Sequence, residues 1–599
     1  MSSDDRPDNL VDMFERSVAK HGSNKLFGTK NKAGEYEWVT YAEVAKRVDD
    51  LRGGLAADGF GKGDCVGIIA NNRVEWAIIA YATYSLGARF IPMYEAELES
   101  TWKYIIGDSG IKALFISKPE LLEKVEGFAS DFPGLKLYLI EGDGPNTMAD
   151  LERKGREKPV PSVKPAGPDD IALLIYTSGT TGEPKGVLLS HGNLTSNVVD
   201  CGACFPDLNE EDRSLSILPW AHSFGQTADL NNYIYIGGSL GLVESPQTVV
   251  EDLEKTTPTF LIAVPRIFNR VYDGLWAKMD EEGGLPKKLF VMGVDAGKKK
   301  RELAEQGKTS MWVNVKYNLA DKIVFKKIRE KFGGKLKGAV TGSAMMNPEI
   351  AYFFSDLGIP TYDCYGLTET SPGATMNRPG KNKIGTVGSA IPNCRIVIDN
   401  SVVDEGADDG EIIVYGPNVM KGYQNKPEAT AEVMTPDGGF RTGDRGRLDD
   451  DGYLKVTGRL KEQYKLLNGK YVFPSSIEEE IKLLPLVANC MIFGEGKEYN
   501  ICLLVPDFEV LPKHVEGAEG KEPAVLAKDK AVQDAIEKQV KDALKGTYGS
   551  YEIPKKFVFL TEDFTLENGM LTQTLKLKRR IVVDTFGEEI EAQYQQPAK

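Results

Sequence analysis

The chain has 599 residues, of which 41% are hydrophobic, 9% aromatic and 27% charged. A chain of this length forms several structural units rather than one small binding module, and its ordinary composition excludes a disordered or collagen-like protein. Its 73 Lys and Arg residues against 88 Asp and Glu residues give a net charge of −15. That charge disfavours nucleic acid as a partner and confines any anion binding to local patches.

The chain carries the features of a cytoplasmic protein. Its seven cysteines are scattered and too few for a disulfide framework at this length. The start, MSSDDRPDNL, is acidic and lacks the apolar core of a signal peptide. The longest uncharged stretch near it, 76–88, is too short to span a bilayer and is predicted to form a buried helix.

The first part of the chain, about 8–118, alternates short apolar runs with helix-like stretches. VGIIA (66–70) and ALFIS (113–117) are the clearest runs. This alternation predicts a parallel sheet with helical crossovers, and therefore an α/β fold. A Pro-rich connector at 159–170 interrupts the pattern, and the uniformly apolar run at 171–176 then predicts a central strand buried on both faces.

Three further units of a strand followed by a loop are predicted downstream, at 259–265, 337–344 and 359–366. Beyond about 382 the pattern changes, because RIVID and GEIIVYG are separated by Asp/Gly turns typical of antiparallel strands. We expect a small β subdomain at about 382–460. The last segment, 461–599, has strands and helices of its own and a Lys-rich end.

The first chemical signal is YTSGTTGEPKG at 176–186. Its small residues offer hydroxyl and backbone N–H donors without bulk, and Lys185 adds a cation, so the loop can wrap a polyphosphate. The Pro184-Lys185-Gly186 ending departs from the Walker pattern, which requires Gly, Lys and then Ser or Thr. A nucleotide site is favoured over a plain glycine loop.

The second signal is YGLTET at 365–370, directly after an apolar strand. A carboxylate at the carboxyl end of a strand, on a Gly-containing turn, is well sited to hold Mg²⁺ on phosphate oxygens. Glu369 is that candidate, and the motif alone equally permits a glutamate that stabilises a helix N-terminus.

Together with four more segments, these motifs resemble the adenylate-forming superfamily of acyl-CoA synthetases, luciferases and peptide-synthetase adenylation domains. The additional segments are LPWAHSFGQ (218–226), RTGDRG (441–446), GRLKEQYK (458–465) and LTQTLKLKRR (571–580), all in the family's order. LPWAHSFGQ, VPRIFNRVYD (264–273) and NGKYVFPSSIE (468–478) are most similar to the long-chain fatty acyl-CoA synthetases. The resemblance covers nearly the whole chain.

The resemblance implies a domain layout. The N-terminal AMP-binding domain would span 1–460, with two stacked α/β parallel-sheet subdomains and a small β-barrel-like subdomain. A smaller, mobile α+β C-terminal domain would span 461–599.

The resemblance also implies a two-step reaction and its cofactors. A carboxylate attacks the α-phosphorus of ATP to give acyl-AMP and pyrophosphate, and CoA then displaces AMP. Mg²⁺ would be directed by Glu369 and Thr177. The phosphates would be held by Thr177, Ser178, Gly179, Thr180, Thr181 and Lys185. The adenine and α-phosphate would be lined by Gly342, Ser343, Tyr365, Gly366 and Thr368.

Three further residues take roles from the same resemblance. Asp444 would accept hydrogen bonds from the ribose hydroxyls, and Arg459 would pair with a phosphate or ribose oxygen. His222 would line the mouth of the acyl pocket, where Gln226 replaces the aromatic gate of some long-chain relatives. By themselves, Asp444 could be an Asx-turn residue, Arg459 a surface charge and His222 a structural histidine.

The C-terminal segment supplies the remaining implied residues. Lys576 aligns with the adenylation lysine, although Leu575 replaces the usual small residue before it, and Lys578 is the rival. Lys461 occupies the hinge position about which the C-terminal domain turns between the two half-reactions. CoA would lie against Gly469.

A local basic patch stands out against the net negative charge. The segment 321–338 carries seven cations, with apolar residues at helical spacing on an opposing face. It is compatible with a seat for the CoA phosphates, a membrane surface or a solvated face.

These features predict an ATP-dependent long-chain fatty acid–CoA ligase whose partners are the small molecules fatty acid, ATP and CoA. It would be cytoplasmic, with peripheral contact to the inner membrane face and a homodimer left open. The alternatives are an adenylating ligase for aryl or short acids, transfer of fatty acyl-AMP to a carrier protein, and a non-catalytic acyl-nucleotide sensor. Lys185, Glu369 and Lys576 together argue against the sensor, because binding alone does not need an adenylation lysine.

Overall fold

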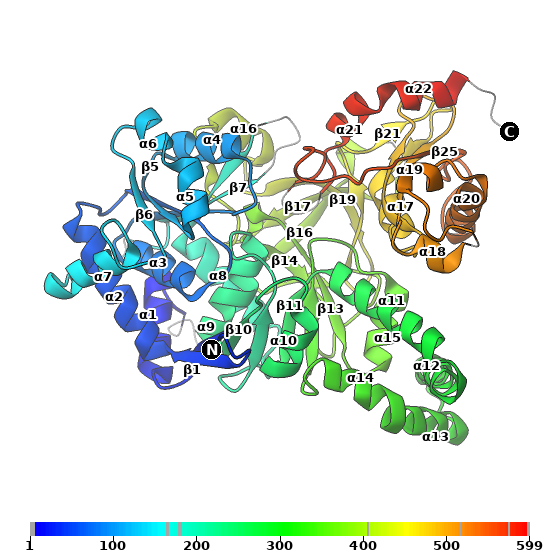
Figure 1. The fold of residues 1–599 in the computed structure, drawn as a ribbon, viewed down its shortest axis with the longest axis horizontal. Helices are drawn as coiled ribbons and strands as arrows, with labels where there is room; N and C mark the ends of the chain where they lie inside the picture. The colour runs from blue at the N-terminus through cyan, green and yellow to red at the C-terminus, as the bar shows by residue number, and fades with distance from the viewer. Residues whose placement is uncertain are drawn as a thin grey trace. The chain divides into compact units, whose positions relative to one another are not determined.

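The computed structural model resolves the chain into two compact units. It describes residues 6–162, 167–177, 183–403, 407–515, 517–572 and 576–595. The first unit comprises residues up to 397 with 413–442 and 448–455, and the second comprises 398–412, 443–447 and 456–599. The predicted α/β class with a separate C-terminal unit is confirmed (Figure 1).

A seven-stranded sheet in the order β18-β8-β7-β4-β3-β5-β6 organises the first part of the N-terminal unit. Its strands are β3 (Cys65–Ile69), β4 (Arg89–Met93), β5 (Ile111–Ile116), β6 (Lys136–Leu139), β7 (Ile171–Thr177), β8 (Lys185–Ser190) and β18 (Gly422–Tyr423). The connecting helices are α2 (Tyr41–Ala57), α3 (Val74–Ser85), α4 (Glu99–Ser109), α5 (Pro119–Val125), α6 (Phe128–Asp131), α7 (Met148–Glu157) and α8 (His191–Gly202). The apolar run at 76–88 supplies most of α3, which is a buried helix as predicted.

The sheet is mixed rather than purely parallel. Strands β3 to β7 pair in parallel, whereas β8 pairs antiparallel with β7, and β18 pairs antiparallel with β8. Only a short loop joins β7 to β8, and a parallel pair would need a long crossover. The Gly/Thr loop, residues 178–184, therefore connects two antiparallel strands. Helix α8 begins later, where the Ser190 and Asn193 side chains cap its first turn.

A second, five-stranded sheet has the order β11-β12-β13-β14-β15. Its strands are β11 (Phe260–Ala263), β12 (Gly338–Thr341), β13 (Thr361–Gly366), β14 (Gly373–Met376) and β15 (Ser389–Ala390). The first three are parallel and correspond to the three predicted strand-and-loop units, while β14 and β15 are antiparallel additions. Its helices include α10 (Val249–Thr256), α11 (Pro265–Glu282) and α15 (Pro348–Asp356).

A third sheet of this unit has the order β2-β1-β10-β9, and helices α1 and α9 contact each other. The strands are β1 (Lys25–Lys30), β2 (Tyr36–Thr40), β9 (Arg213–Ser216) and β10 (Ser239–Leu242), and the helices are α1 (Leu10–His21) and α9 (Asn232–Ile236).

A four-stranded sheet has the order β16-β17-β19-β20, with β16 and β20 as its outer strands. The strands are β16 (Arg395–Asp399), β17 (Gly410–Tyr415), β19 (Phe440–Leu448) and β20 (Leu454–Arg459), and α16 (Pro427–Val433) lies between β18 and β19 in sequence. The β-rich character predicted for 382–460 is confirmed. The barrel-like closure is not confirmed, and the division between the two units falls within each of these strands.

The remainder of the C-terminal unit is α+β. Its sheets are β21 (Tyr464–Lys465) with β22 (Tyr471–Val472), and β23 (Val487–Phe493), β24 (Ile501–Pro506) and β25 (Lys556–Phe559). Its helices are α17 (Pro474–Ile481), α18 (Leu511–His514), α19 (Pro523–Leu526), α20 (Lys530–Leu544), α21 (Arg579–Thr585) and α22 (Gly587–Gln595). Every fourth residue of α20 is buried in the core, because that spacing repeats on one helix face: Val532, Ile536, Val540 and Leu544.

A further group of helices lies between β11 and β12 in sequence. It consists of α12 (Gly284–Glu305), α13 (Met311–Ala320), the π-helical segment η3 (Asp321–Phe325) and α14 (Lys326–Lys331), drawn together in green in Figure 1. The predicted apolar face of the basic segment is confirmed, since Val324, Ile328 and Phe332 are buried. Throughout the described ranges, no helix has the length and apolar content needed to cross a membrane.

Candidate active site

Glu369 lies just beyond the carboxyl end of β13, in the short turn Thr368–Thr370. Its backbone carbonyl accepts a hydrogen bond from the Met420 amide at 2.9 Å. Its side chain is half-buried, and Oε1 accepts a hydrogen bond from the Tyr423 hydroxyl at 2.9 Å. The other carboxylate oxygen makes no hydrogen bond to any residue that the structure describes, so it is available to a ligand.

Lys185 begins β8 and pairs with Thr177, the last residue of β7. Its ammonium nitrogen lies 5.0 Å from the centre of the Tyr423 ring. Tyr423 thus contacts both the predicted phosphate-binding lysine, through its ring, and the predicted metal-binding carboxylate, through its hydroxyl. Ser178, Gly179, Thr180 and Thr181 lie outside the described residues.

Sequence reasoning missed Tyr423. It belongs to the two-residue strand β18, which pairs with β8, and it is only 8% exposed. Burial, followed by the charge of Glu369 and the hydrogen bond to it, raises the pKa of Tyr423. Its hydroxyl therefore stays protonated at neutral pH and remains a donor to the carboxylate. A two-residue strand leaves no periodic signal in a sequence, so pattern alone could not have singled it out.

The residues predicted for the adenine and α-phosphate follow two neighbouring parallel strands. Gly342 and Ser343 come directly after β12, and Tyr365 and Gly366 end β13. Because β12 and β13 are parallel neighbours, their carboxyl ends meet at one sheet edge. A Cβ atom at Gly342 would lie 2.8 Å from the Cys364 sulfur, so a glycine is required there.

The predicted acyl-pocket segment meets this edge at Phe224, whose ring would lie 3.3 Å from a Cβ atom at Gly342, and at Ser223. Ser223 Oγ and Thr368 Oγ1 are 3.2 Å apart and both are buried, so they join LPWAHSFGQ to YGLTET. His222 is partly exposed, and its Nδ1 accepts a hydrogen bond from the Phe224 amide at 3.2 Å. Gln226 is buried, with its amide nitrogen donating to the Tyr84 hydroxyl at 3.0 Å.

The segment after His222 is a π-helix, η2 (Gly225–Asn231), with an unusual load of buried polar groups. Burial raises the pKa of Asp229 to about 6. One of its oxygens accepts hydrogen bonds from Ser216 and Trp220, while the other has no partner among the described residues. Further polar atoms without such a partner belong to Gln226, Thr227, Asn231 and Asn232. π-Helical turns occur often at functional sites, and no sequence pattern predicted this one.

In the C-terminal unit, Asp444 and Arg459 form an ion pair with Arg459 Nε 2.9 Å from Asp444 Oδ1. Asp444 is 4% exposed, whereas the Arg459 side chain is 38% exposed. Lys461 is exposed in the turn that follows β20. Gly469 lies in the turn between β21 and β22 with a φ of 82°, a conformation that favours glycine.

Lys576 is exposed and held by its backbone near the end of the chain. Its amide donates to Thr572 Oγ1 at 3.0 Å, and its carbonyl accepts from the Thr572 amide at 2.8 Å. Lys578 is partly buried directly before α21, whose first residue, Arg579, pairs with the buried Glu478. Residues 573–575, including Leu575, lie outside the described residues.

Two sets of candidate residues therefore belong to different compact units. Lys185, Glu369 and the strand-end residues belong to the first, and Asp444, Arg459, Lys461, Gly469 and Lys576 belong to the second. Within the described residues, no group of three or more His, Cys, Asp or Glu side chains could hold a metal ion by itself. A cation at Glu369 would thus need ligands from elsewhere, as Mg²⁺ on nucleotide phosphates has.

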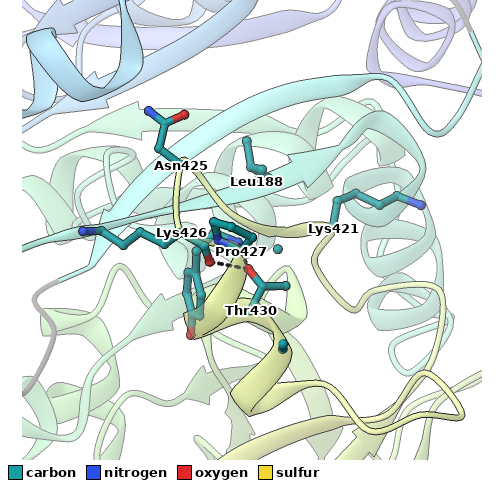
Figure 2. Close-up of a pocket in the computed structure, with 9 residues that line it drawn as sticks. Leu188, Lys421, Asn425, Lys426, Pro427 and Thr430 are labelled. Carbon is teal, nitrogen blue, oxygen red and sulfur yellow. Dashed lines mark hydrogen bonds between the residues drawn. The ribbon is translucent and has the colours of Figure 1, made fainter.

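A shallow pocket of about 460 Å³ lies beside Tyr423, between β18 and α16. Figure 2 shows Pro427 near its centre, with Lys421 and Lys426 extending in opposite directions. These lysines are also paired with carboxylates, Lys421 with Asp169 and Lys426 with Glu183. Because the two cations do not converge, this pocket is not a second phosphate site.

Known proteins resemble this chain over almost its whole length. The AMP-binding enzyme family matches residues 14–424, and the family of AMP-binding enzyme C-terminal domains matches residues 461–598. Long chain acyl-CoA synthetase 7 of Arabidopsis thaliana is 31% identical, over 98% of this chain and 86% of that protein. Human long-chain-fatty-acid–CoA ligase 6 is 32% identical, over 98% of this chain and 86% of that protein.

Solved structures share the fold. The adenylation domain of a carboxylate reductase from Mycobacterium chelonae matches with a TM-score of 0.78 at 23% identity, over 98% of this chain and 91% of that one. ATP-bound MatB from Rhodopseudomonas palustris matches with a TM-score of 0.71 at 24% identity, over 96% and 99%. The motifs, the fold and the full-length similarity agree: the chain belongs to the AMP-binding enzyme family, among relatives that include the long-chain acyl-CoA synthetases.

Proposed function

We propose that this protein is an ATP-, Mg²⁺- and CoA-dependent long-chain fatty acid–CoA ligase. In the first step a fatty acid carboxylate oxygen bonds to the α-phosphorus of ATP and pyrophosphate leaves. In the second step the CoA sulfur bonds to the acyl carbon, AMP leaves with the electron pair of the C–O bond, and the thiol proton is released. The full-length similarity to proteins named as such ligases supports this activity.

One observation carries the proposal: Tyr423 links Lys185 to Glu369. Tyr423 holds a cation and a carboxylate close together, so both can act on one polyphosphate. The cation can contact the phosphate oxygens, and the carboxylate can bind the metal ion that accompanies them. Because both nucleophiles come from the substrates, the protein needs positioning and charge stabilisation more than a reactive side chain of its own.

The donor set at Glu369 fits Mg²⁺. This ion is usually bound by one or two carboxylates with phosphate oxygens and water, and Glu369 offers one carboxylate oxygen without a described partner. Glu369, with the hydroxyl of Thr177, would hold the ion. When bound, Mg²⁺ neutralises phosphate charge.

The N-terminal residues would bind the rest of the nucleotide. Lys185 and the loop residues 178–181 hold the β- and γ-phosphates. The strand-end residues at 342–343 and 365–366, with Thr368, line the adenine and α-phosphate. His222 lines the mouth of the acyl pocket. These roles suit the parallel strand ends, where ligands of α/β sheets commonly bind.

The C-terminal residues would serve the remaining groups. Asp444, kept in place by Arg459, accepts hydrogen bonds from the ribose hydroxyls, and Lys576 bridges the attacking carboxylate and the α-phosphate. We place the domain boundary at 460/461, with Lys461 as the hinge and Gly469 against CoA.

The activity is tested with saturated acids from two to twenty carbons, with and without CoA. Pyrophosphate release from ATP is measured, and acyl-CoA is identified by mass. We expect release with long acids and acyl-CoA only when CoA is present. Glu369→Gln keeps the side-chain shape but removes the charge, so it should lose both steps while remaining folded.

The rival activities give different results in the same panel. A maximum on acetate or benzoate would overturn the long-chain assignment. Acyl-AMP that CoA fails to discharge would indicate transfer to a carrier protein, and nucleotide binding without pyrophosphate release would indicate a sensor.

A further inference from the structure

The run α13–η3 exposes a stripe of large apolar side chains. Met311 is 77% exposed, Trp312 75%, Val315 52%, Leu319 46% and Ile323 40%. Four of these residues are spaced by four, so those in α13 lie along one helix face. Exposed apolar residues are ordinarily scattered singly, and a continuous stripe indicates an interaction surface.

The opposite face of the same run is firmly packed, which fixes the direction of the exposed one. A Cβ atom at Gly293 of α12 would lie 2.6 Å from Ala320 Cβ and 2.7 Å from Phe325 Cζ, so the helices are in close contact. The Tyr317 hydroxyl donates to the Asp356 carbonyl at 2.6 Å. The stripe is therefore presented outward by a supported helix.

The charge around the stripe is positive in an otherwise acidic protein. Residues 306–329 contain six cations and one acid, a net charge of +5 against −15 for the chain. The acid, Asp321, is paired with Arg329 at 2.6 Å. Five lysines in 306–329 are exposed and have no ion-pair partner among the described residues: Lys308, Lys316, Lys322, Lys326 and Lys327.

A CoA seat on the basic segment 321–338 is less well supported. Three of its seven cations are already paired with carboxylates: Arg329 with Asp321, Lys331 with Glu254 and Lys337 with Asp212. The unpaired lysines accompany the apolar stripe. A soluble nucleotide offers no apolar surface to cover that stripe. A lipid surface offers acyl chains to the apolar side chains and anionic headgroups to the lysines.

We propose that the α13–η3 face docks on the surface of an anionic lipid bilayer. The apolar residues enter the boundary between headgroups and acyl chains, and the lysines contact the anionic headgroups. Trp312 lies at the membrane–water interface, where tryptophan is enriched. The negative charge elsewhere disfavours other orientations. The inference rests on the proposed function in one respect: docking would place a long-chain ligase beside the bilayer that dissolves its substrate.

The test is flotation of the full-length protein with vesicles of phosphatidylcholine alone or mixed with phosphatidylserine, without substrates. We expect binding to the mixed vesicles, weakened by salt, and little binding to phosphatidylcholine. Trp312→Ser/Leu319→Ser should weaken binding at least tenfold. Lys316→Glu/Lys322→Glu should weaken it by roughly fivefold or more for each lysine, since a lysine near an anionic surface contributes about that factor.

Matched controls change equally exposed residues elsewhere. Val250 is 51% exposed on α10, so Val250→Ser tests the loss of an apolar side chain. Lys528→Glu/Lys538→Glu tests charge reversal on exposed lysines of the C-terminal unit. Both controls should bind vesicles like the parent protein.

Three results would overturn the proposal: parent-like vesicle binding by both test variants, a raised KM for CoA in the lysine variant, or no vesicle binding with a dimer that Trp312→Ser/Leu319→Ser dissociates. The last result would make the face a subunit interface.

Activity on a short, freely soluble acid separates the docking proposal from the proposed function. If docking fails while the parent remains an active ligase, only the docking inference falls, and if the parent adenylates no acid, the proposed function falls.

Discussion

Replacing Tyr423 by Phe isolates the hydrogen bond that orients Glu369. The ring remains to fill its buried site and to face Lys185, and only the hydroxyl that donates to Glu369 Oε1 at 2.9 Å is lost. A hydrogen bond to a charged group contributes about 1.5–3 kcal/mol. Glu369 is half-buried, so water can replace part of that contribution, and the lower end of the range applies.

We therefore expect Tyr423→Phe to lower acid-dependent ATP–pyrophosphate exchange at limiting Mg²⁺ by about tenfold to a hundredfold, the usual effect of removing a group that orients a metal ligand. The loss should appear as a raised half-saturating Mg²⁺ concentration and shrink at high Mg²⁺. The free energy of unfolding should fall by about 1.5 kcal/mol, the lower end of that range. A Mg²⁺ titration of the exchange rate measures the first effect, and thermal unfolding the second.

Two comparisons make the result specific. If Tyr423 acts through Glu369, adding Tyr423→Phe to Glu369→Asp, which keeps a carboxylate and should keep residual activity, should cause little further loss. Tyr415 is a matched control, because its hydroxyl also donates to a carboxylate, Asp437, at 3.1 Å on an exposed surface. An unchanged Mg²⁺ requirement in Tyr423→Phe, or effects that simply add in the double variant, would refute the positioning role.

The remaining predictions concern the C-terminal lysines and a buried acid. Lys576→Ala should reduce ATP–pyrophosphate exchange about a hundredfold to a thousandfold yet still convert supplied acyl-AMP and CoA to acyl-CoA; a defect in Lys578→Ala instead would reassign the role. Lys461→Pro should spare exchange and block thioester formation, because a proline stiffens the hinge and the Lys461 amide bonds to no described residue; a normal second step would contradict this. Burial raises the pKa of Asp229 from 3.8 to about 6, so the folded protein holds this proton more tightly than the unfolded chain does. The free energy of unfolding should therefore be highest below pH 4 and fall by about 3 kcal/mol as the pH rises through 6. Asp229→Asn should flatten that slope in melting temperatures measured from pH 4 to 8, and an unchanged slope would show that Asp229 is not its source.

The sequence by itself determined the class of fold and the positions of the main motifs. Unbroken apolar runs such as 171–176 are short, so they specify strands buried on both faces. Glycines and small hydroxyl residues directly after such runs specify loops at strand ends. This local logic placed Glu369 just after β13 and put Thr177 and Lys185 at either end of the Gly/Thr loop, as the structure has them.

Tertiary structure decided which of these residues meet. Tyr423 reaches Glu369 and Lys185 only because β18 pairs with β8, and a two-residue pairing between distant segments has no local pattern to reveal it. The antiparallel turn from β7 to β8 was likewise invisible, because an apolar run does not encode strand direction. The raised pKa of Asp229 depends on burial among π-helical neighbours, which composition cannot supply. Local sequence fixes what each segment is, whereas contacts between distant segments fix what each side chain faces.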